Sequence, residues 1–206
     1  MTTDRFNIYE TLCFQIAKKS FDYLDEHIER MSGTAAFFDR EFDDKRIRDQ
    51  IAVWVSDIRP ETDAQTEDGR IAPQLRVRFY LDPDGRFLIA SEPMFPLNQP
   101  IRSAFCKERT RSTNILRQHK TTQREVYDRA IERAVQRGYW DVVCRNERDE
   151  ITEGARTNVF LKTPSGWVTP PLECGLLPGV FRRVFERVVG EPLTERVLTA
   201  DDLRAG

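Results

Sequence analysis

Three short segments in the second half of the chain constrain its fold and its chemistry more than any other feature. They read HKTT at residues 119–122, EITEGARTNVF at residues 150–160 and VTPPLECGLLPGVFR at residues 168–182. The first contains a lysine, the second a glutamate next to a glycine, and the third the start of a predicted helix. These groups can supply an amine, a carboxylate and free backbone N–H groups. Such a set suits a ligand that carries an aldehyde, a ring nitrogen and a phosphate.

Lys120 is the candidate amine. Lysine is scarce in this chain, because only six of its 32 lysines and arginines are lysines. We predict that Lys120 lies where a helix begins, with Thr121 and Thr122 as N-cap candidates. That helix would bury one apolar stripe, formed by Val126, Tyr127, Ala130, Ile131 and Ala134. A lysine near a helix start can lose its proton and attack an aldehyde, which an arginine cannot do. The alternative is an ordinary solvated lysine.

Glu153 is the candidate acid. Residues 140–145 (WDVVCR) predict a short buried strand, residues 146–150 (NERDE) a turn, and residues 157–161 the partner strand. Glu153 would then lie near the end of a hairpin, followed by Gly154, where the backbone can approach a ligand closely. A carboxylate at this place can keep a pyridinium nitrogen protonated. The alternative is an exposed glutamate in a turn.

The third segment predicts a helix from Pro178 to Gly190, with proline at its first position and glycine at its end. Its free N–H groups would face a phosphate, and the helix dipole would add to the attraction. The N–H groups in question belong to Gly179, Val180 and Phe181. Every helix start offers such groups, so this segment is informative only together with the other two. An amine, an acid and a phosphate cradle are the three anchors of pyridoxal phosphate (PLP).

The order and spacing of these motifs resemble those of the class IV aminotransferase family of fold-type IV PLP enzymes. The motifs are HKTTxR, E(I/V)TEGxRTNVF and TPPLxxGLLPGVxR, and they are most similar to the family's 4-amino-4-deoxychorismate lyase branch. Two N-terminal stretches, IYETL at residues 8–12 and YLDEHIERMSGTAAFF at residues 23–38, resemble the same branch. The likeness extends from about residue 6 to residue 203.

The resemblance implies a role at the cofactor for several residues. Lys120 would form the Schiff base and later move a substrate proton, and Glu153 would hold the pyridinium nitrogen. The phosphate cradle would consist of Gly179, Val180 and Phe181. Asn158 would line the face of the cofactor. The cofactor itself would be PLP.

Three further residues are implied by the same resemblance. Thr11 matches a threonine that assists proton transfer when pyruvate leaves. Arg156 falls in the loop that lines the cofactor face. Arg124 would support the site, and it would share a helix face with Lys120 because it follows one helical turn later.

The resemblance implies a lyase that converts 4-amino-4-deoxychorismate to 4-aminobenzoate and pyruvate in folate biosynthesis. One alternative is an aminotransferase acting on an amino acid. By the same resemblance, branched-chain and D-amino-acid members carry an arginine on the cofactor phosphate at the position of Tyr23, and its absence here weakens the aminotransferase alternative more than the lyase. Another alternative is a non-catalytic relative with weak cofactor binding, because relatives continue past Gly206 into a final strand that helps to close the site. The resemblance also implies a homodimer.

Composition excludes several other classes of function. The net charge of −2 has both signs interleaved, which gives no reason to expect nucleic acid or an anionic membrane as a partner. No apolar run approaches the ~20 residues of a membrane span, and the first ten residues lack the order of a signal peptide. The four cysteines form no CxxC pair and the chain has only two histidines, so we expect no metal site and a cytoplasmic, reducing location. We expect His27 to be a packed or capping residue, whereas His119 could touch the cofactor.

The overall pattern predicts a two-domain α/β (α+β) fold. A small N-terminal α/β domain would span residues 1–109, a connector residues 110–118, and a β-rich PLP-binding domain residues 119–206. Within the first domain we expect a hairpin from residues 6–14 and 21–23, and a second hairpin around DPDG at residues 82–85. Helices are expected at residues 25–38 and 44–55, and a polar surface loop at residues 56–70. The cofactor would lie between the two domains.

Overall fold

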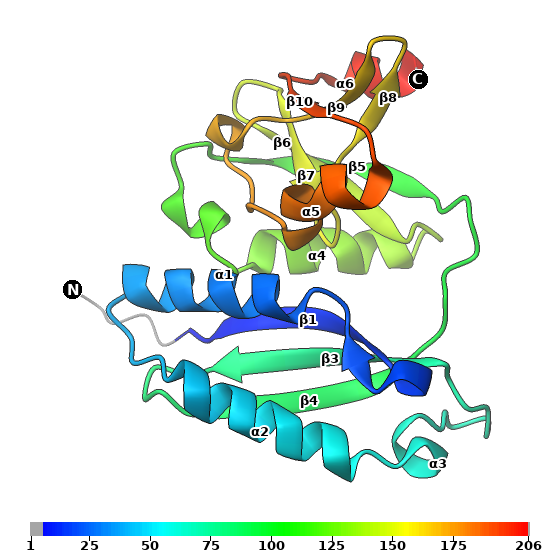
Figure 1. The fold of residues 1–206 in the computed structure, drawn as a ribbon. Coiled ribbons are helices and arrows are strands. Elements are labelled where there is room, and N and C mark those ends of the chain that lie inside the picture. Colours follow the sequence, from blue (N-terminus) through cyan, green and yellow to red (C-terminus); the bar gives the residue numbers. More distant parts are fainter. Residues whose placement is uncertain (1–5, 206) are drawn as a thin grey trace. The chain divides into compact units, whose positions relative to one another are not determined.

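The computed structural model describes residues 6–205, which form two compact units with a mixed α/β fold (Figure 1). The first unit comprises the residues up to 97 together with 120–122, and the second comprises residues 98–119 and those from 123 onward. No helix in the described part of the chain is both long and apolar enough to cross a membrane.

The first unit contains an antiparallel sheet in the order β2-β1-β3-β4. Its strands are β1 (Ile8–Gln15), β2 (Ser20–Phe21), β3 (Gln74–Leu81) and β4 (Phe87–Met94). A 3-10 helix at Ile16–Lys18 links β1 to β2. The helices of this unit are α1 (Leu24–Phe37), α2 (Asp44–Asp57) and the short α3 (Pro60–Asp63). Both predicted hairpins and both long predicted helices are therefore confirmed, while α3 lies in the stretch that the sequence predicts as a loop.

Alternation along the strands separates the two faces of this sheet. In β3 every second residue is fully buried in the hydrophobic core, namely Leu75, Val77, Phe79 and Leu81. The residues between them are polar or aromatic and belong to the opposite face. Helix α2 begins at a residue that sequence can identify, because Asp43 accepts a hydrogen bond from the N–H of Arg46 at 2.9 Å.

A charged cluster is buried between β1 and α1. Glu10 has no exposed surface, and its carboxylate accepts hydrogen bonds from Arg30 Nε at 2.8 Å and contacts His27 Nδ1 at 2.7 Å. Burial alone would raise the pKa of Glu10, but the charge of Arg30 and the hydrogen bonds from Arg30 and His27 hold it at about 2. His27 is thus a packed residue, as expected from the sequence.

The second unit contains two three-stranded sheets. One has the order β5-β6-β7 and consists of β5 (Ser103–Thr110), β6 (Asp141–Asn146) and β7 (Ile151–Gly154); the other has the order β10-β9-β8. Its strands are β8 (Leu161–Thr163), β9 (Gly166–Thr169) and β10 (Leu193–Glu195). The helices are α4 (Glu125–Val135), α5 (Val180–Val189) and α6 (Ala200–Ala205), with 3-10 helices at Ile115–Gln118 and Leu172–Cys174. Helix α4 packs on β5 and β6 through a core that includes Tyr127, Ala130 and Cys144.

Three features differ from the sequence prediction. The partner of β6 is β7, so the expectation that residues 157–161 pair with it is wrong. Helix α4 begins at Glu125, so the expectation of a helix start at Lys120 with threonine caps is also wrong. Strand β5 pairs in parallel with β6 and therefore groups with the second unit, whereas the predicted boundaries place residues 98–109 in the first domain.

Candidate functional site

Lys120 is held by backbone pairing with β1. The C=O of Lys120 accepts a hydrogen bond from the N–H of Tyr9 at 3.0 Å, and Thr121 forms an antiparallel bridge with Ile8. The hydroxyl of Thr122 accepts a hydrogen bond from the N–H of Asn7 at 3.0 Å. Both threonines therefore pair with the start of β1 instead of capping a helix. This pairing makes Lys120 a neighbour of the N-terminal sheet.

The side chain of Lys120 lies over an aromatic ring of β1. Its Nζ is 4.7 Å from the centroid of the Tyr9 ring, within the range of a cation–π contact. Tyr9 and Thr11 are two residues apart on β1, so their side chains point to the same face of the sheet, opposite the face that carries the buried Glu10. Lys120 and Thr11 are thus associated with one face of the same sheet.

Glu153 is a buried carboxylate in the middle of β7. Its residue surface is only 7% exposed, which excludes the alternative of a glutamate in an exposed turn. Oε1 accepts a hydrogen bond from the hydroxyl of Tyr127 at 2.7 Å, and Oε2 accepts one from the N–H of Leu177 at 3.3 Å. Burial, followed by the charge of Glu153, raises the pKa of Tyr127 well above its ordinary value, so Tyr127 remains a hydrogen-bond donor.

Tyr127 is itself fixed by two arginines. The guanidinium carbon of Arg117 lies 4.7 Å from the centroid of the tyrosine ring, and that of Arg124 lies 5.6 Å from it. Arg124 also donates a hydrogen bond to the C=O of Ala155 at 2.6 Å. Arg124 therefore contacts the segment that follows Glu153, and its supporting role at a cofactor site stays a prediction. The predicted helix face shared with Lys120 does not exist, because Lys120 precedes α4 and lies outside any helix.

The start of α5 lies close to Asn158. Gly179 is the N-cap residue and offers no side chain to satisfy the first N–H groups of the helix. A Cβ atom added to Gly179 would lie 2.0 Å from Oδ1 of Asn158, so only glycine permits this approach. Val180 is buried and Phe181 is partly exposed, with its ring 5.7 Å from that of Phe160. Asn158 and the three cradle residues are therefore neighbours in the second unit.

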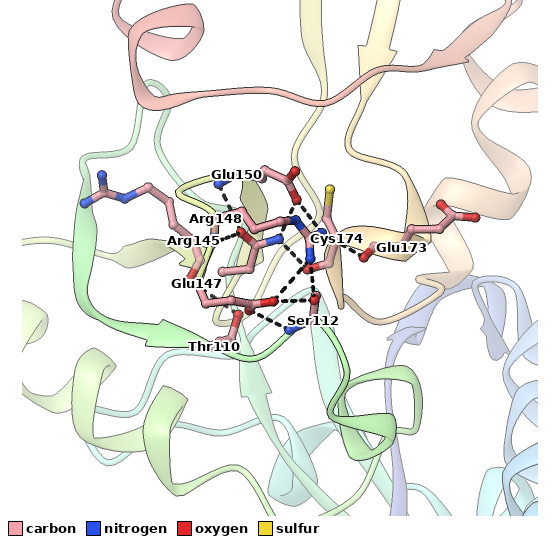
Figure 2. A network of polar contacts seen from close by, with 9 residues as sticks. Thr110, Ser112, Arg145, Glu147, Arg148, Glu150, Glu173 and Cys174 are labelled. Carbon is pink, nitrogen blue, oxygen red and sulfur yellow. Dashed lines mark hydrogen bonds and ion pairs between the residues drawn. The ribbon is translucent and has the colours of Figure 1, made fainter.

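A polar network holds the loop that leads to this helix (Figure 2). Asn146, which is fully buried, donates a hydrogen bond to the C=O of Cys174 at 3.1 Å, and Arg148 donates to the C=O of Glu173 at 3.2 Å. Arg148 also donates to the hydroxyl of Ser112 at 2.7 Å. These contacts fix the 3-10 helix at Leu172–Cys174. Leu177, whose N–H donates a hydrogen bond to Glu153, follows this helix in the chain.

Gly175 shows how tightly this loop is packed. Its φ is +83°, and an added Cβ atom would lie 2.5 Å from the Cα atom of Ser112. Ser112 in turn donates hydrogen bonds from its N–H and its hydroxyl to the carboxylate of Glu147, at 2.8 and 2.5 Å. These two bonds hold the pKa of Glu147 at about 2. The loop therefore has little freedom to shift away from Glu153.

Sequence reasoning missed Tyr127, Asn146 and Leu177 as contributors to this site. Tyr127 occupies a position of the apolar stripe of α4, so its hydroxyl gave no separate signal.

Arg156 was predicted to line the cofactor face, and the structure places its guanidinium 5.5 Å from the ring of Trp140. His119 is partly buried, and burial lowers its pKa.

Residues 7–206 match the family described as Amino-transferase class IV. The chain belongs to this family. A solved structure of a candidate amino-acid aminotransferase from Mesorhizobium loti is 30% identical, with a TM-score of 0.82 over 97% of this chain and 90% of that one. A candidate 4-amino-4-deoxychorismate lyase from Legionella pneumophila is 18% identical, with a TM-score of 0.75 over 96% of this chain and 75% of that one.

A third similar structure is a branched-chain aminotransferase from Thermoproteus uzoniensis. It is 20% identical, with a TM-score of 0.79 over 97% of this chain and 71% of that one. No curated protein matches the chain significantly. The two structures below 25% identity share the fold, and the family assignment depends on the family match and on the Mesorhizobium loti protein.

Membership of this family makes the chain a PLP-dependent enzyme. The residues of the second unit fit that cofactor. Glu153 is a buried carboxylate oriented by hydrogen bonds from the Tyr127 hydroxyl at 2.7 Å and the Leu177 N–H at 3.3 Å, and a carboxylate is the acceptor that a ring N–H requires. The start of α5 has a glycine N-cap, and its dipole favours a phosphate.

Proposed function

We propose that this protein is a lyase that converts 4-amino-4-deoxychorismate to 4-aminobenzoate and pyruvate. The observation that carries the proposal is the position of Thr11. Its side chain belongs to the face of the N-terminal sheet on which Lys120 lies over Tyr9. A hydroxyl on the same sheet face as the amine suits a reaction in which one group removes a proton and another returns a proton to a leaving group.

Each residue of the site has a role in this proposal. When bound, PLP supplies an aldehyde for a Schiff base and a ring that withdraws electrons. Lys120 Nζ removes the proton from the substrate carbon that bears the amine. Thr11 Oγ1 relays that proton from Lys120 to the departing pyruvate, receiving one proton as it gives up its own. The carboxylate of Glu153 would hold the ring N–H, while Tyr127 donates a hydrogen bond to its Oε1.

The second unit would hold the phosphate. The N–H groups of Gly179, Val180 and Phe181 would bind it at the start of α5, and Asn158 packs against Gly179 at that helix start. Arg124 stabilises the segment after β7 through the C=O of Ala155. Arg156 completes the proposed site as a residue of the cofactor-lining loop.

An amino-acid aminotransferase is the second candidate function. The observation in its favour is the 30% identity with the candidate amino-acid aminotransferase from Mesorhizobium loti. Against it, Tyr23 stands where branched-chain and D-amino-acid members of the family carry an arginine. Tyr23 is the N-cap of α1. Its backbone has the left-handed conformation, with a φ of 58°.

The product analysis of a single incubation separates the two functions. The PLP-loaded protein is incubated with 4-amino-4-deoxychorismate, and 4-aminobenzoate is measured by fluorescence and pyruvate by reduction with lactate dehydrogenase. We expect both products in equal amounts without any added keto acid. Turnover that requires 2-oxoglutarate, with no release of pyruvate, would instead establish an aminotransferase.

Thr11→Val is the matched variant for this assay. Valine keeps the shape of threonine and removes the hydroxyl, so the variant should retain PLP and lose turnover by about a hundredfold, the range expected for loss of a general acid. Unchanged turnover in Thr11→Val would remove Thr11 from the mechanism.

We also propose that the protein acts as a cytoplasmic homodimer. The four cysteines of the chain are free, which suits a reducing compartment. The resemblance to class IV aminotransferases supports the dimer, and light scattering after size-exclusion chromatography tests it. A mass close to one chain of 24.1 kDa would contradict the dimer.

A further inference from the structure

The face of the N-terminal sheet that carries Thr11 also carries a row of basic residues on β3. The register pairs Tyr9 with Tyr80, Thr11 with Arg78, and Cys13 with Arg76. Side chains of directly paired residues in an antiparallel sheet have Cβ atoms about 4.5–5.5 Å apart. The side chain of Arg78 therefore leaves the sheet next to the side chain of Thr11, and its guanidinium extends toward Glu92 on β4. The rings of Tyr9 and Tyr80 stack at 6.1 Å on the same face.

Arg76 and Arg78 differ in how far they are already neutralised. Arg76 binds Oε1 of Glu92 through Nε at 2.7 Å and Nη2 at 2.6 Å. Arg78 reaches the same oxygen only at 3.6 Å through Nη1, which is too long for a hydrogen bond. The side chain of Arg78 is 38% exposed. Arg76 is thus engaged by a carboxylate of the protein, whereas Arg78 keeps donors that can bind another carboxylate.

We propose that Arg78 binds the carboxylate of the substrate's enolpyruvyl group. This inference rests on the lyase function proposed above. In that reaction the enolpyruvyl group leaves as pyruvate, and Thr11 passes it a proton, so the group has to lie at Thr11. Its carboxylate then lies within reach of the residue paired with Thr11. The planar fork of an arginine binds a carboxylate through two parallel hydrogen bonds, which fixes both the position and the orientation of that group.

Glu92 modulates this site in the proposal. It attracts Arg78 weakly at 3.6 Å and so competes with a bound carboxylate. Arg78 is a substrate-binding residue in this account, and it brings the leaving group to Thr11. An interaction made equally before and during the reaction changes KM more than kcat. Loss of Arg78 should therefore appear mainly as a raised KM.

Binding of chorismate to the PLP-loaded protein tests the proposal without turnover. Chorismate has the same two carboxylates as 4-amino-4-deoxychorismate, but it carries a hydroxyl where that substrate carries an amine. We expect Arg78→Gln to weaken chorismate binding by about tenfold or more in calorimetry, the range for a lost hydrogen bond to a charged group. Binding of 4-hydroxybenzoate, which lacks the enolpyruvyl carboxylate, should change by less than about threefold. With 4-amino-4-deoxychorismate, the same variant should raise KM more than it lowers kcat.

Three further variants serve as controls. Arg48→Gln removes the same charge on α2, where Arg48 pairs with Asp25 and Asp44, and should leave chorismate binding unchanged. Arg78→Lys keeps the charge without the fork and should restore part of the affinity. Glu92→Gln removes the competing carboxylate and should strengthen binding.

The outcomes separate this proposal from the lyase function. Arg78 does not bind the enolpyruvyl carboxylate if Arg78→Gln binds chorismate as tightly as the wild type does. The same conclusion follows if the substitution weakens the binding of chorismate and of 4-hydroxybenzoate equally. Failure of the wild type to bind chorismate overturns the assignment as well. A wild type that binds chorismate through Arg78 but releases no 4-aminobenzoate from aminodeoxychorismate would overturn the lyase function alone.

Discussion

Replacement of Glu10 by glutamine should destabilise the first unit strongly at neutral pH. Glu10 is fully buried and is held by Arg30 and His27, which keep its pKa at about 2 against an ordinary value of 4.5. A depression of about 2.5 pKa units corresponds to about 3 kcal/mol of stability from the ionised carboxylate. Glu10→Gln removes that charge from beside the buried Arg30 guanidinium, so we expect a loss of about 3 kcal/mol or more at pH 7.

The loss should depend on pH in a defined direction. The folded state depresses the pKa of Glu10, so its contribution is fully present above about pH 4.5 and disappears as the pH falls toward 2. The difference between the wild type and Glu10→Gln should therefore be constant between pH 7 and about 5 and should shrink below about 4.5.

Urea unfolding measured through Trp54 provides the assay. Trp54 packs against Phe14 and Phe21 in the core of the first unit, so its fluorescence reports on that unit once Trp140 and Trp167 are replaced by phenylalanine. The exposed Asp49→Asn, which breaks a surface pair with Lys45, is the matched charge control and should cost less than about 1 kcal/mol. A loss below about 1 kcal/mol for Glu10→Gln, or one that does not shrink in acid, would refute the reasoning.

Two further predictions concern the cofactor site and use the dissociation constant of PLP, measured by absorbance with the apoprotein. Tyr127→Phe removes a hydrogen bond to the buried carboxylate of Glu153, which should weaken PLP binding by roughly tenfold. An unchanged dissociation constant would mean that Tyr127 only fills space. Gly179→Ala places a methyl group 2.0 Å from Asn158 Oδ1 and should weaken PLP binding by about tenfold or more. Gly33→Ala, where an added Cβ meets nothing within 4 Å, should leave PLP binding unchanged, and equal losses in both alanine variants would point to a global effect instead.

Local signals in the sequence were sufficient for most of the first unit. The alternation of Leu75, Val77 and Phe79 with polar residues marks β3, and the DPDG turn marks the hairpin with β4. Asp43 marks the start of α2 because it accepts a hydrogen bond from the helix. In the second unit, Gly190 ends α5 with a φ of 74°, as the predicted helix end requires.

Features set by distant contacts could not be predicted in the same way. Lys120 is placed by hydrogen bonds with β1, more than 100 residues earlier, and no local pattern records such pairing. The short stretch Ile151–Gly154 pairs with β6, although the β-branched and aromatic residues at 157–161 have the stronger strand propensity. The hydrogen bond from Tyr127 to Glu153 likewise joins two elements that only the folded chain brings together.

The central claim is that Lys120 forms the Schiff base with PLP. Reduction of the PLP-loaded protein with borohydride, followed by peptide mapping, tests it most directly, because reduction fixes the cofactor on the lysine that held it. We predict a single modified lysine, Lys120, and a colourless Lys120→Ala protein that gives no modified peptide. Label on any other of the six lysines, or a wild type that stays colourless with added PLP, would contradict the account.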